Sequence, residues 1–316
     1  MESIFSGNLA YVAVVVTDVE KTAATLGRDF GLRRTDCTVG REGRTAPVFA
    51  IGASAVALFA PGDPFVAGHS RPGVHHIALE TPDLQAAAHA AVLAGVPTAE
   101  LEPSPGFRGR RRLALAPAAT AGVRTYLSEP LEVERSAGGW VERLDHLGVA
   151  SADNRAAMEV FVTRLGCPLE SSQTDVEVQI AVETFTSDKY GVVCHARPPE
   201  PVGGLRVAFV MIGDCELEFL EDFDPRPGAW LAHDRPGTTK QDRGAIARFI
   251  ASQGPGLHHI ALKVTDINRA LEMLARAGHR LIDPVGRPGS RRALIGFIHP
   301  TSLNGVLVHL VEREAN

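Results

Sequence analysis

Hydrophobic and polar positions divide the chain into four similar units, each of which predicts a strand, a helix and a short run of strands. Residues 9–17, LAYVAVVVT, have the β-branched content of a buried strand. Asp18 predicts the N-cap of a helix over residues 19–30, and Gly31 predicts its end. Two or three strands follow, the clearest at 53–59, before a Pro-Gly-Asp-Pro turn closes the unit.

The fourth unit, near the end of the chain, repeats the sequence of the second. VHHIAL at 74–79 is matched by LHHIAL 183 residues later, and the register holds without a gap from 74–129 against 257–312. Seventeen of those 56 positions are identical. A repeat of this length indicates a duplicated chain, so the fold has to be interpreted repeat by repeat.

The third unit resembles the first in the same way. LDHLGVASAD at 144–153 aligns with LAYVAVVVTD at 9–18, and CELEFLEDFDP at 215–225 aligns with SAVALFAPGDP at 54–64. Four strand–helix–strands units in two pairs predict the α+β class.

The two pairs predict two domains, over residues 1–132 and 140–316, with a linker near Gly138-Gly139. Two insertions without a counterpart in the first half cover roughly 174–202 and 226–250. Both contain polar and aromatic residues.

Composition narrows the classes of partner. The 316 residues, 45% hydrophobic and 22% charged, suffice for two cores, and a net charge of −5 argues against nucleic acid and anionic membrane as partners. The early apolar run at 9–16 is too short for a signal peptide or a membrane span. The four cysteines form no CxxC pair, which favours reduced thiols and a cytoplasmic protein.

Candidate metal ligands occur on four strands of the second half, whereas three of the four equivalent first-half positions carry unsuitable side chains. These second-half residues are His146, Glu218, His259 and His309, and their first-half equivalents are Tyr11, Ala57, His76 and Tyr126. A lone histidine on a strand usually has only a structural role in the core or on the surface. Here four polar residues are retained in strands that are otherwise apolar, which favours a metal site. Imidazole and carboxylate suit one divalent ion of Zn, Fe, Mn, Co or Ni, without choosing among them.

Four motifs carry a resemblance to a known family: LDHLGVA, CELEFLED, GLHHIALKVTDINRALEMLARAGHRLID and FIHPTSLNGVLVHLVE. They resemble the vicinal oxygen chelate superfamily, which includes glyoxalase I, methylmalonyl-CoA epimerase, extradiol dioxygenases and antibiotic-resistance proteins. The resemblance implies four βαβββ modules, paired into two curved mixed sheets that each form a cup. It also implies metal ligation by His146, Glu218, His259 and His309. The second half is most similar to methylmalonyl-CoA epimerase.

His309 departs from the family pattern, because the epimerases have a Glu there that touches the metal and moves a proton. The resemblance therefore implies that His309 is a ligand or a base, and we expect His309 and Glu218 to be the catalytic residues. The counterpart of the second epimerase base falls in a region disrupted by the first insertion, where Glu183 and Glu200 are candidates.

We expect a metal-dependent enzyme that transfers a proton next to a carbonyl: an epimerase, isomerase or glyoxalase-like lyase. Its substrate would be a small molecule with a carbonyl or vicinal oxygens, and Arg287, Arg291 and Arg292 are weaker candidates for binding its acidic group. One alternative is an iron(II) dioxygenase of extradiol or hydroxyphenylpyruvate type. Another is a non-catalytic small-molecule binding protein. The sequence is also compatible with a homodimer.

The half-specific pattern predicts that only the second half binds a metal. The substitution His259→Ala should abolish stoichiometric metal binding, whereas His76→Ala should leave it intact. Elemental analysis of the two purified variants checks this, and equal loss of metal from both would contradict the assignment.

Overall fold

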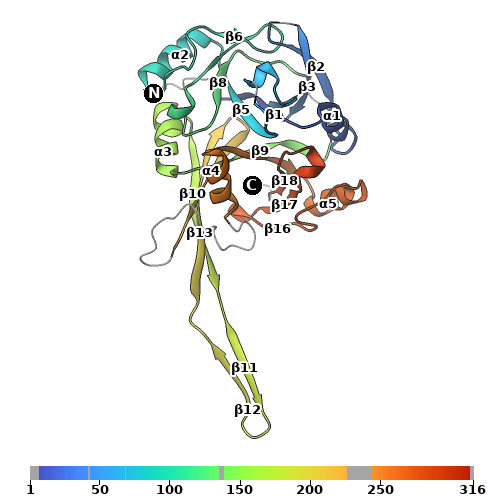
Figure 1. The fold of residues 1–316 in the computed structure, drawn as a ribbon, viewed down its shortest axis with the longest axis vertical. Helices are drawn as coiled ribbons and strands as arrows, with labels where there is room; N and C mark the ends of the chain where they lie inside the picture. Colours follow the sequence, from blue (N-terminus) through green and yellow to red (C-terminus); the bar gives the residue numbers. More distant parts are fainter. Residues whose placement is uncertain (1–6, 42, 68, 135–138, 226–243, 314–316) are drawn as a thin grey trace.

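The computed structural model describes residues 7–313 apart from 42, 68, 135–138 and 226–243. Within this part, two curled mixed sheets contain eight strands each (Figure 1). The first sheet comprises β1 (Leu9–Val15), β2 (Arg34–Val39), β3 (Arg44–Ile51), β4 (Ser54–Phe59), β5 (Gly73–Glu80), β6 (Ser104–Pro105), β7 (Arg111–Ala114) and β8 (Thr125–Ser128). The second comprises β9 (Val141–Ala150), β10 (Leu169–Gln179), β13 (Glu200–Ile212), β14 (Cys215–Phe223), β15 (Gly256–Val264), β16 (Arg287–Pro288), β17 (Leu294–Ile298) and β18 (Val308–Glu312).

The two sheets have the same topology. Their strand orders are β2-β3-β4-β1-β5-β8-β7-β6 and β10-β13-β14-β9-β15-β18-β17-β16. Tyr11 in β1 lies opposite Ala78, as His146 in β9 lies opposite Ala261. The predicted α+β fold of paired modules is therefore confirmed. The domain boundaries at 132 and 140 stay a prediction, and Gly138 of the expected linker lies outside the described residues.

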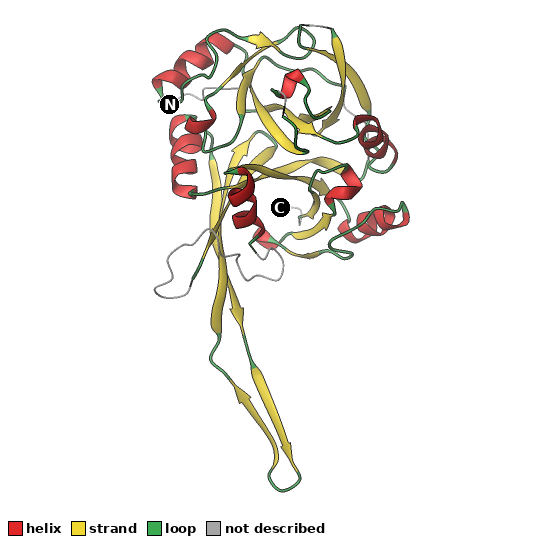
Figure 2. Cartoon of the chain, viewed as in Figure 1, coloured by secondary structure: helices red, strands yellow, loops and turns green. Residues whose placement is uncertain are grey.

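Each unit begins its helix with an aspartate cap. The α-helices are α1 (Val19–Arg28), α2 (Leu84–Leu93), α3 (Asn154–Met158), α4 (Ala245–Gln253) and α5 (Ile267–Arg276). Asp18, Asp83, Asp153 and Asp266 accept backbone N–H bonds from the first turns of α1, α2, α3 and α5, which satisfies donors that have no partner inside the helix. These four helices lie along the outer sides of the sheets (Figure 2). No helix of the described part is long and apolar enough to cross a bilayer.

The two halves meet through a pair of matching glycine–proline contacts. A Cβ on Gly122 would lie 2.4 Å from the Pro255 carbonyl oxygen, and one on Gly305 would lie 2.4 Å from the Pro72 Cβ. Both glycines also have a positive φ, 83° and 104°. Glycine is therefore required at both positions, for the close approach and for the backbone conformation. Gly122 and Gly305, like Pro72 and Pro255, are equivalent in the repeat. The halves are therefore related by an approximate two-fold at this contact.

Of the two predicted insertions, the first forms a long hairpin. β10 and β13 run beyond the sheet, and β11 (Val182–Ser187) and β12 (Gly191–Ala196) continue the hairpin to its tip (Figure 1). Residues 226–243 of the second insertion lie outside the described part, and α4 follows them.

The inner face of the first sheet is filled by side chains. Arg112 is buried at its centre, and its guanidinium carbon lies 3.5 Å from the ring centroid of Phe65 and 4.4 Å from that of Tyr126. It donates to the Phe65 carbonyl at 2.9 Å and lies 3.2 Å from His76 Nε2. The position equivalent to Arg112 in the other half is Ile295. The positively charged guanidinium of Arg112 thus lies among aromatic rings inside the first cup.

Removal of this guanidinium should destabilise the first half. We expect Arg112→Ala to lower the free energy of unfolding by about 3 kcal/mol, because it leaves a cavity and an unpaired buried carbonyl. The exposed neighbour Arg110 provides a control, whose replacement by alanine should change stability by less than about 0.5 kcal/mol. Urea unfolding of both variants measures the difference, and equal stabilities would contradict a structural role for Arg112.

Candidate metal centre

Four side chains from four strands converge on the inner face of the second sheet. His146 (β9), Glu218 (β14), His259 (β15) and His309 (β18) are all buried, and ligand atoms of the three histidines lie within 4.8 Å of one another. His146 Nε2 lies 3.1 Å from Glu218 Oε2 and 3.0 Å from His309 Nε2. His259 Nε2 lies 3.6 Å from the same carboxylate oxygen. The four residues singled out from the sequence are therefore neighbours in space.

The spacing of these atoms fits a divalent cation. A tetrahedral ion with metal–nitrogen bonds of about 2.0–2.1 Å places its ligand atoms about 3.3–3.4 Å apart. The separations of 3.0, 3.1 and 3.6 Å lie on both sides of that value. Three imidazoles and one carboxylate are also a donor set that Zn²⁺, Fe²⁺, Co²⁺ and Ni²⁺ accept. The buried group could hold one divalent metal.

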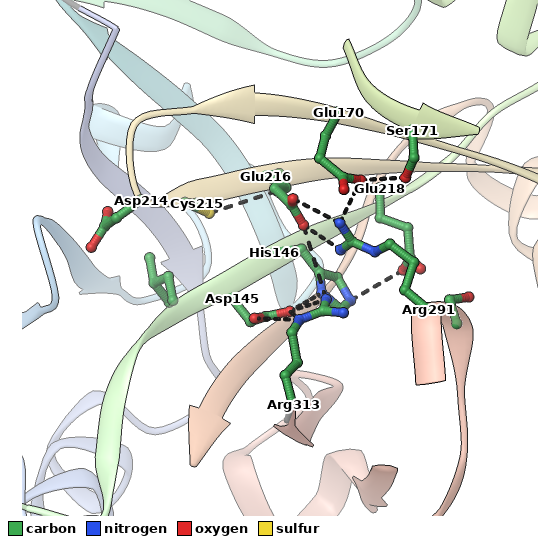
Figure 3. Close-up of polar contacts among 12 residues, drawn as sticks. Asp145, His146, Glu170, Ser171, Asp214, Cys215, Glu216, Glu218, Arg291 and Arg313 are labelled. Carbon is green, nitrogen blue, oxygen red and sulfur yellow. Dashed lines mark hydrogen bonds and ion pairs between the residues drawn. The ribbon is translucent and has the colours of Figure 1, made fainter. Parts of the chain in front are cut away.

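A β-bulge aims His146 and gives it a supporting carboxylate. Leu144 and His146 lie opposite Leu262 and Ala261, which leaves Asp145 as the extra residue in β9. Asp145 is fully buried and its Oδ2 lies 2.9 Å from His146 Nδ1 (Figure 3). This contact fixes Nδ1 as the donor and leaves Nε2 for a ligand, as is common around protein-bound metals.

Arg313 anchors Asp145 from the other side. Its Nε and Nη2 donate to the carboxylate at 3.0 and 2.5 Å, and Figure 3 shows Asp145 in contact with both the arginine and His146. The first-half equivalent of Asp145 is Ala10. This support was not predicted, although the sequence LDHLG contains the Asp-His pair.

Gly148 makes room for His259. The two residues lie opposite each other on β9 and β15, and a Cβ on Gly148 would come within 2.0 Å of the imidazole. The equivalent first-half residue is Ala13, opposite His76. A side chain at 148 would therefore displace His259 from the cluster.

Burial and charge set the protonation of the metal-free cluster. Burial alone would lower the pKa of His146, but Glu218 and Asp145 raise it to about 9. Burial would raise the pKa of Glu218, but His146 and His259 lower it well below its usual range. Burial and the neighbouring histidines lower the pKa of His309. At neutral pH, His146 is therefore the protonated imidazole, flanked by two carboxylates.

A cavity of about 240 Å³ opens over the cluster. Its walls are largely apolar and include Phe209 and Phe297. Glu218 is the sole carboxylate among its described lining residues, which also include three arginines: Arg248, Arg287 and Arg313. A basic rim around a metal-binding floor suits a small anionic ligand.

Of the three arginines proposed from the sequence, only Arg287 lines this cavity, where it also forms an ion pair with Asp283 at 3.1 Å. Arg291 lies over the Phe209 ring and is held by Glu216 and Glu170 at 2.5 and 2.6 Å (Figure 3). Arg292 is exposed and is not among the described lining residues. The carboxylate partners of Arg291 make it a structural residue of the cup wall.

His258 differs from the simple strand alternation that would turn it away from the cup. It is the extra residue of a second bulge, between Leu257 and His259, and it lines the cavity. Its Nδ1 lies 3.0 Å from His259 Nδ1, and burial lowers its pKa to about 3. The candidate bases Glu183 and Glu200 lie on the long hairpin and are not among the described lining residues.

A larger cavity of about 930 Å³ lies between the two halves. It is lined by residues near the glycine–proline contacts and by His69, His75 and His258. No carboxylate or cysteine occurs among its described lining residues, so it lacks the mixed donor set of the second cup.

Comparison with known proteins identifies the family. The model of the Glyoxalase/Bleomycin resistance protein/Dioxygenase superfamily matches residues 11–113 and 145–297. The chain belongs to this superfamily. This confirms the resemblance found in the sequence motifs.

Relatives within the superfamily carry different names. The chain is 32% identical over 131 residues to a mitochondrial methylmalonyl-CoA epimerase of Dictyostelium discoideum, covering 40% of this chain and 69% of that one. It is 29% identical over 174 residues to a human 4-hydroxyphenylpyruvate dioxygenase-like protein. This match covers 52% of this chain and 41% of that one. The relatives therefore include one named an epimerase and one named a dioxygenase-like protein.

Solved structures support the fold across the whole chain. A mutant of 4-hydroxymandelate synthase from Streptomyces coelicolor superposes with a TM-score of 0.62 at 17% identity, covering 98% of this chain and 93% of that one. A Mn(II)-bound glyoxalase from Novosphingobium aromaticivorans superposes with a TM-score of 0.57 at 14% sequence identity. The match covers 97% of this chain and 82% of that one. At these identities the likeness concerns the fold alone.

The raised pKa of His146 predicts a pH dependence of metal binding. A metal must displace the His146 proton, which is bound below about pH 9, so apparent affinity should fall up to about tenfold per pH unit below 9. Competition titration with Co²⁺ between pH 9.5 and 7 measures the slope. Asp145→Asn removes one of the charges that raise this pKa, so the fall should begin at lower pH. Affinity independent of pH in this range would contradict the assignment of His146.

Proposed function

We propose that the chain is a divalent-metal-dependent enzyme that transfers a proton on the carbon next to a carbonyl of a small anionic substrate. One observation carries this proposal: four buried metal-ligand atoms form the floor of a cavity whose described polar lining includes three arginines and a single carboxylate. The epimerase relatives support the same reaction class.

His146, Glu218, His259 and His309 would hold the metal. A divalent ion bound there supplies Lewis acidity, which polarises a carbonyl oxygen and makes the neighbouring C–H bond more acidic. Asp145 keeps His146 in the tautomer that presents Nε2, and Gly148 leaves the space that His259 occupies.

Arg287 and Arg248 bind and orient the acidic group of the substrate, since Arg313 is held by Asp145. Arg287 and Arg248 line the cavity on the side of β16 and α4, and Arg313 lies beside Asp145. Guanidinium groups bind carboxylates through two parallel hydrogen bonds, which fixes orientation as well as charge. Phe209 and Phe297 in the walls limit the access of water.

His309 and Glu218 are the groups that we assign to proton transfer. His309 is neutral at physiological pH because its pKa is well below the usual value, so it can coordinate a metal or accept a proton. Its Nδ1 is buried without a hydrogen-bond partner among the described residues. Glu218 is ionised and borders the cavity.

Substitution of His309 separates its two roles. If His309 is a ligand, His309→Ala should lower metal affinity by more than about tenfold, and His309→Glu should shift preference toward Mn²⁺ because it adds a harder oxygen donor. If it is a base, His309→Ala should keep metal affinity within a few-fold and abolish proton exchange. Titration of native protein and both variants with Mn²⁺ and Zn²⁺ decides it, and three identical profiles would exclude His309 from the ligand set.

A second candidate function is an iron(II) dioxygenase. His146, His259 and Glu218 provide the two-histidine, one-carboxylate set of such enzymes, and the apolar walls with Phe209 and Phe297 suit an aromatic substrate. A third alternative is binding of a small molecule without turnover.

One experiment distinguishes these functions. Protein loaded with Co²⁺, Mn²⁺ or, anaerobically, Fe²⁺ would be supplied with methylmalonyl-CoA in D₂O, and with catechol or 4-hydroxyphenylpyruvate under oxygen. Deuterium incorporation next to the carbonyl without oxygen uptake is the expected result. Oxygen consumption with iron alone would favour the dioxygenase, and binding without either reaction would favour the binding protein.

A further inference from the structure

The long hairpin has an exposed face that no other described part of the chain covers. Beyond the sheet it is a two-stranded ribbon, made of the outer parts of β10 and β13 and of β11 and β12 at the tip (Figure 2). Two-stranded ribbons of this kind are marginally stable alone, and their apolar side chains stay in water. The ribbon contributes nothing to the metal cluster and is not explained by the proposed function.

The side chains along the ribbon alternate strictly. Between 174 and 186, every even-numbered residue is β-branched: Thr174, Val176, Val178, Ile180, Val182, Thr184 and Thr186. The returning strand adds Ala196, Cys194 and Val192 opposite Val182, Thr184 and Thr186, and paired residues of adjacent strands share a face. We call this surface the even face. None of these ten residues carries a charge.

The opposite face is polar in β10, with Asp175, Glu177 and Gln179, and mixed in β11, where Glu183 is followed by the exposed pair of Phe185 and Val193. Alternation of this kind is typical of strands with one buried and one solvated face. The even face is nevertheless exposed: Val176, Ile180, Val182 and Val192 have relative accessibilities of 47%, 66%, 61% and 64%. The pattern therefore indicates a covered face, whereas a single chain leaves it open.

We propose that the even face packs against the even face of a second copy of this chain, with the two ribbons antiparallel about a two-fold axis. An uncharged apolar strip is complementary to another such strip. Five of the sixteen exposed large apolar residues of the described part lie on the even face, so another copy offers the matching surface. The antiparallel arrangement turns the acidic faces outward and apart, and it makes each contact occur twice.

The dimensions of the even face suit a dimer of moderate stability. The even face is about 40 Å long, for twelve steps between residues at the rise of a strand, and about 10 Å wide, for two strands. Each copy therefore contributes a flat area of roughly 400 Å², to which the uneven surface of the side chains adds. With that addition, the two copies bury on the order of 1,200 Å², the lower limit for stable complexes. We therefore expect a dimer that dissociates in the micromolar range.

Charge substitutions on adjacent residues test the face. Sedimentation velocity between 1 and 100 µM should give a dimer for the native chain and a monomer for Ile180→Asp. Ala181→Asp adds the same charge on the opposite face and should remain dimeric. A hairpin-shortened variant, in which Asn-Gly replaces residues 178–202 between the paired residues Glu177 and Gly203, should be monomeric. Unchanged metal content in all variants checks that the body is folded.

Cysteine cross-linking tests the partner and the register. In a Cys194→Ser background, the one of Val178→Cys, Ile180→Cys and Val182→Cys that lies nearest the two-fold axis should give a disulfide-linked dimer on mild oxidation, whereas Gln179→Cys and Ala181→Cys should not. A native chain that is monomeric at 100 µM would overturn the proposal. So would a dimer that survives Ile180→Asp and hairpin shortening, or cross-linking that does not distinguish even from odd positions.

Discussion

The structure of the second cup depends on the electrostatics of burying polar groups inside a sheet. Asp145 and Glu218 are ionised and buried beside three imidazoles, and ionised groups without compensation are strongly unfavourable in such surroundings. Arg313 compensates Asp145, and a proton on His146 partly compensates Glu218. A divalent ion between Glu218 and the imidazoles would replace that proton and supply positive charge where the site needs it.

The first cup meets the same constraint in another way. Strand order and register are shared, yet Tyr11, Ala57 and Tyr126 occupy three of the four ligand positions. His76, the remaining one, lies 3.2 Å from the Arg112 guanidinium instead of a carboxylate. The two halves thus share the sheet, but three of the four ligand positions of the first cup hold other residues, and an arginine and aromatic rings fill it.

Much of this arrangement could be predicted from the sequence because the repeat encodes it. The 183-residue register gave the equivalence of β5 with β15, and comparison of the halves singled out His146, Glu218, His259 and His309 as a group. Simple alternation could not predict the bulges, since one extra residue changes the side of the strand on which the next side chain lies. Two consequences follow: Asp145 supports His146, and His258 lines the cavity, contrary to simple alternation.

The arginines show another limit of sequence reasoning. Arg287, Arg291 and Arg292 lie in one turn, and their charges are alike in the sequence. Their partners are distant along the chain: Glu170 and Glu216 hold Arg291, while Arg313, which lines the cavity, was not considered. The role that we propose for the hairpin, in contrast, rests on the alternation of its residues and on its pairing.

The most direct test of the account is anomalous diffraction from crystals soaked in Co²⁺ or Zn²⁺, collected at the metal edge. The account predicts one anomalous peak per chain in the second cup, about 2.0–2.2 Å from the Nε2 atoms of His146 and His259 and from a Glu218 oxygen. It predicts no peak beside His76 and Arg112 in the first cup. A peak in the first cup, or none in the second in metal-replete protein at pH 9, would contradict it.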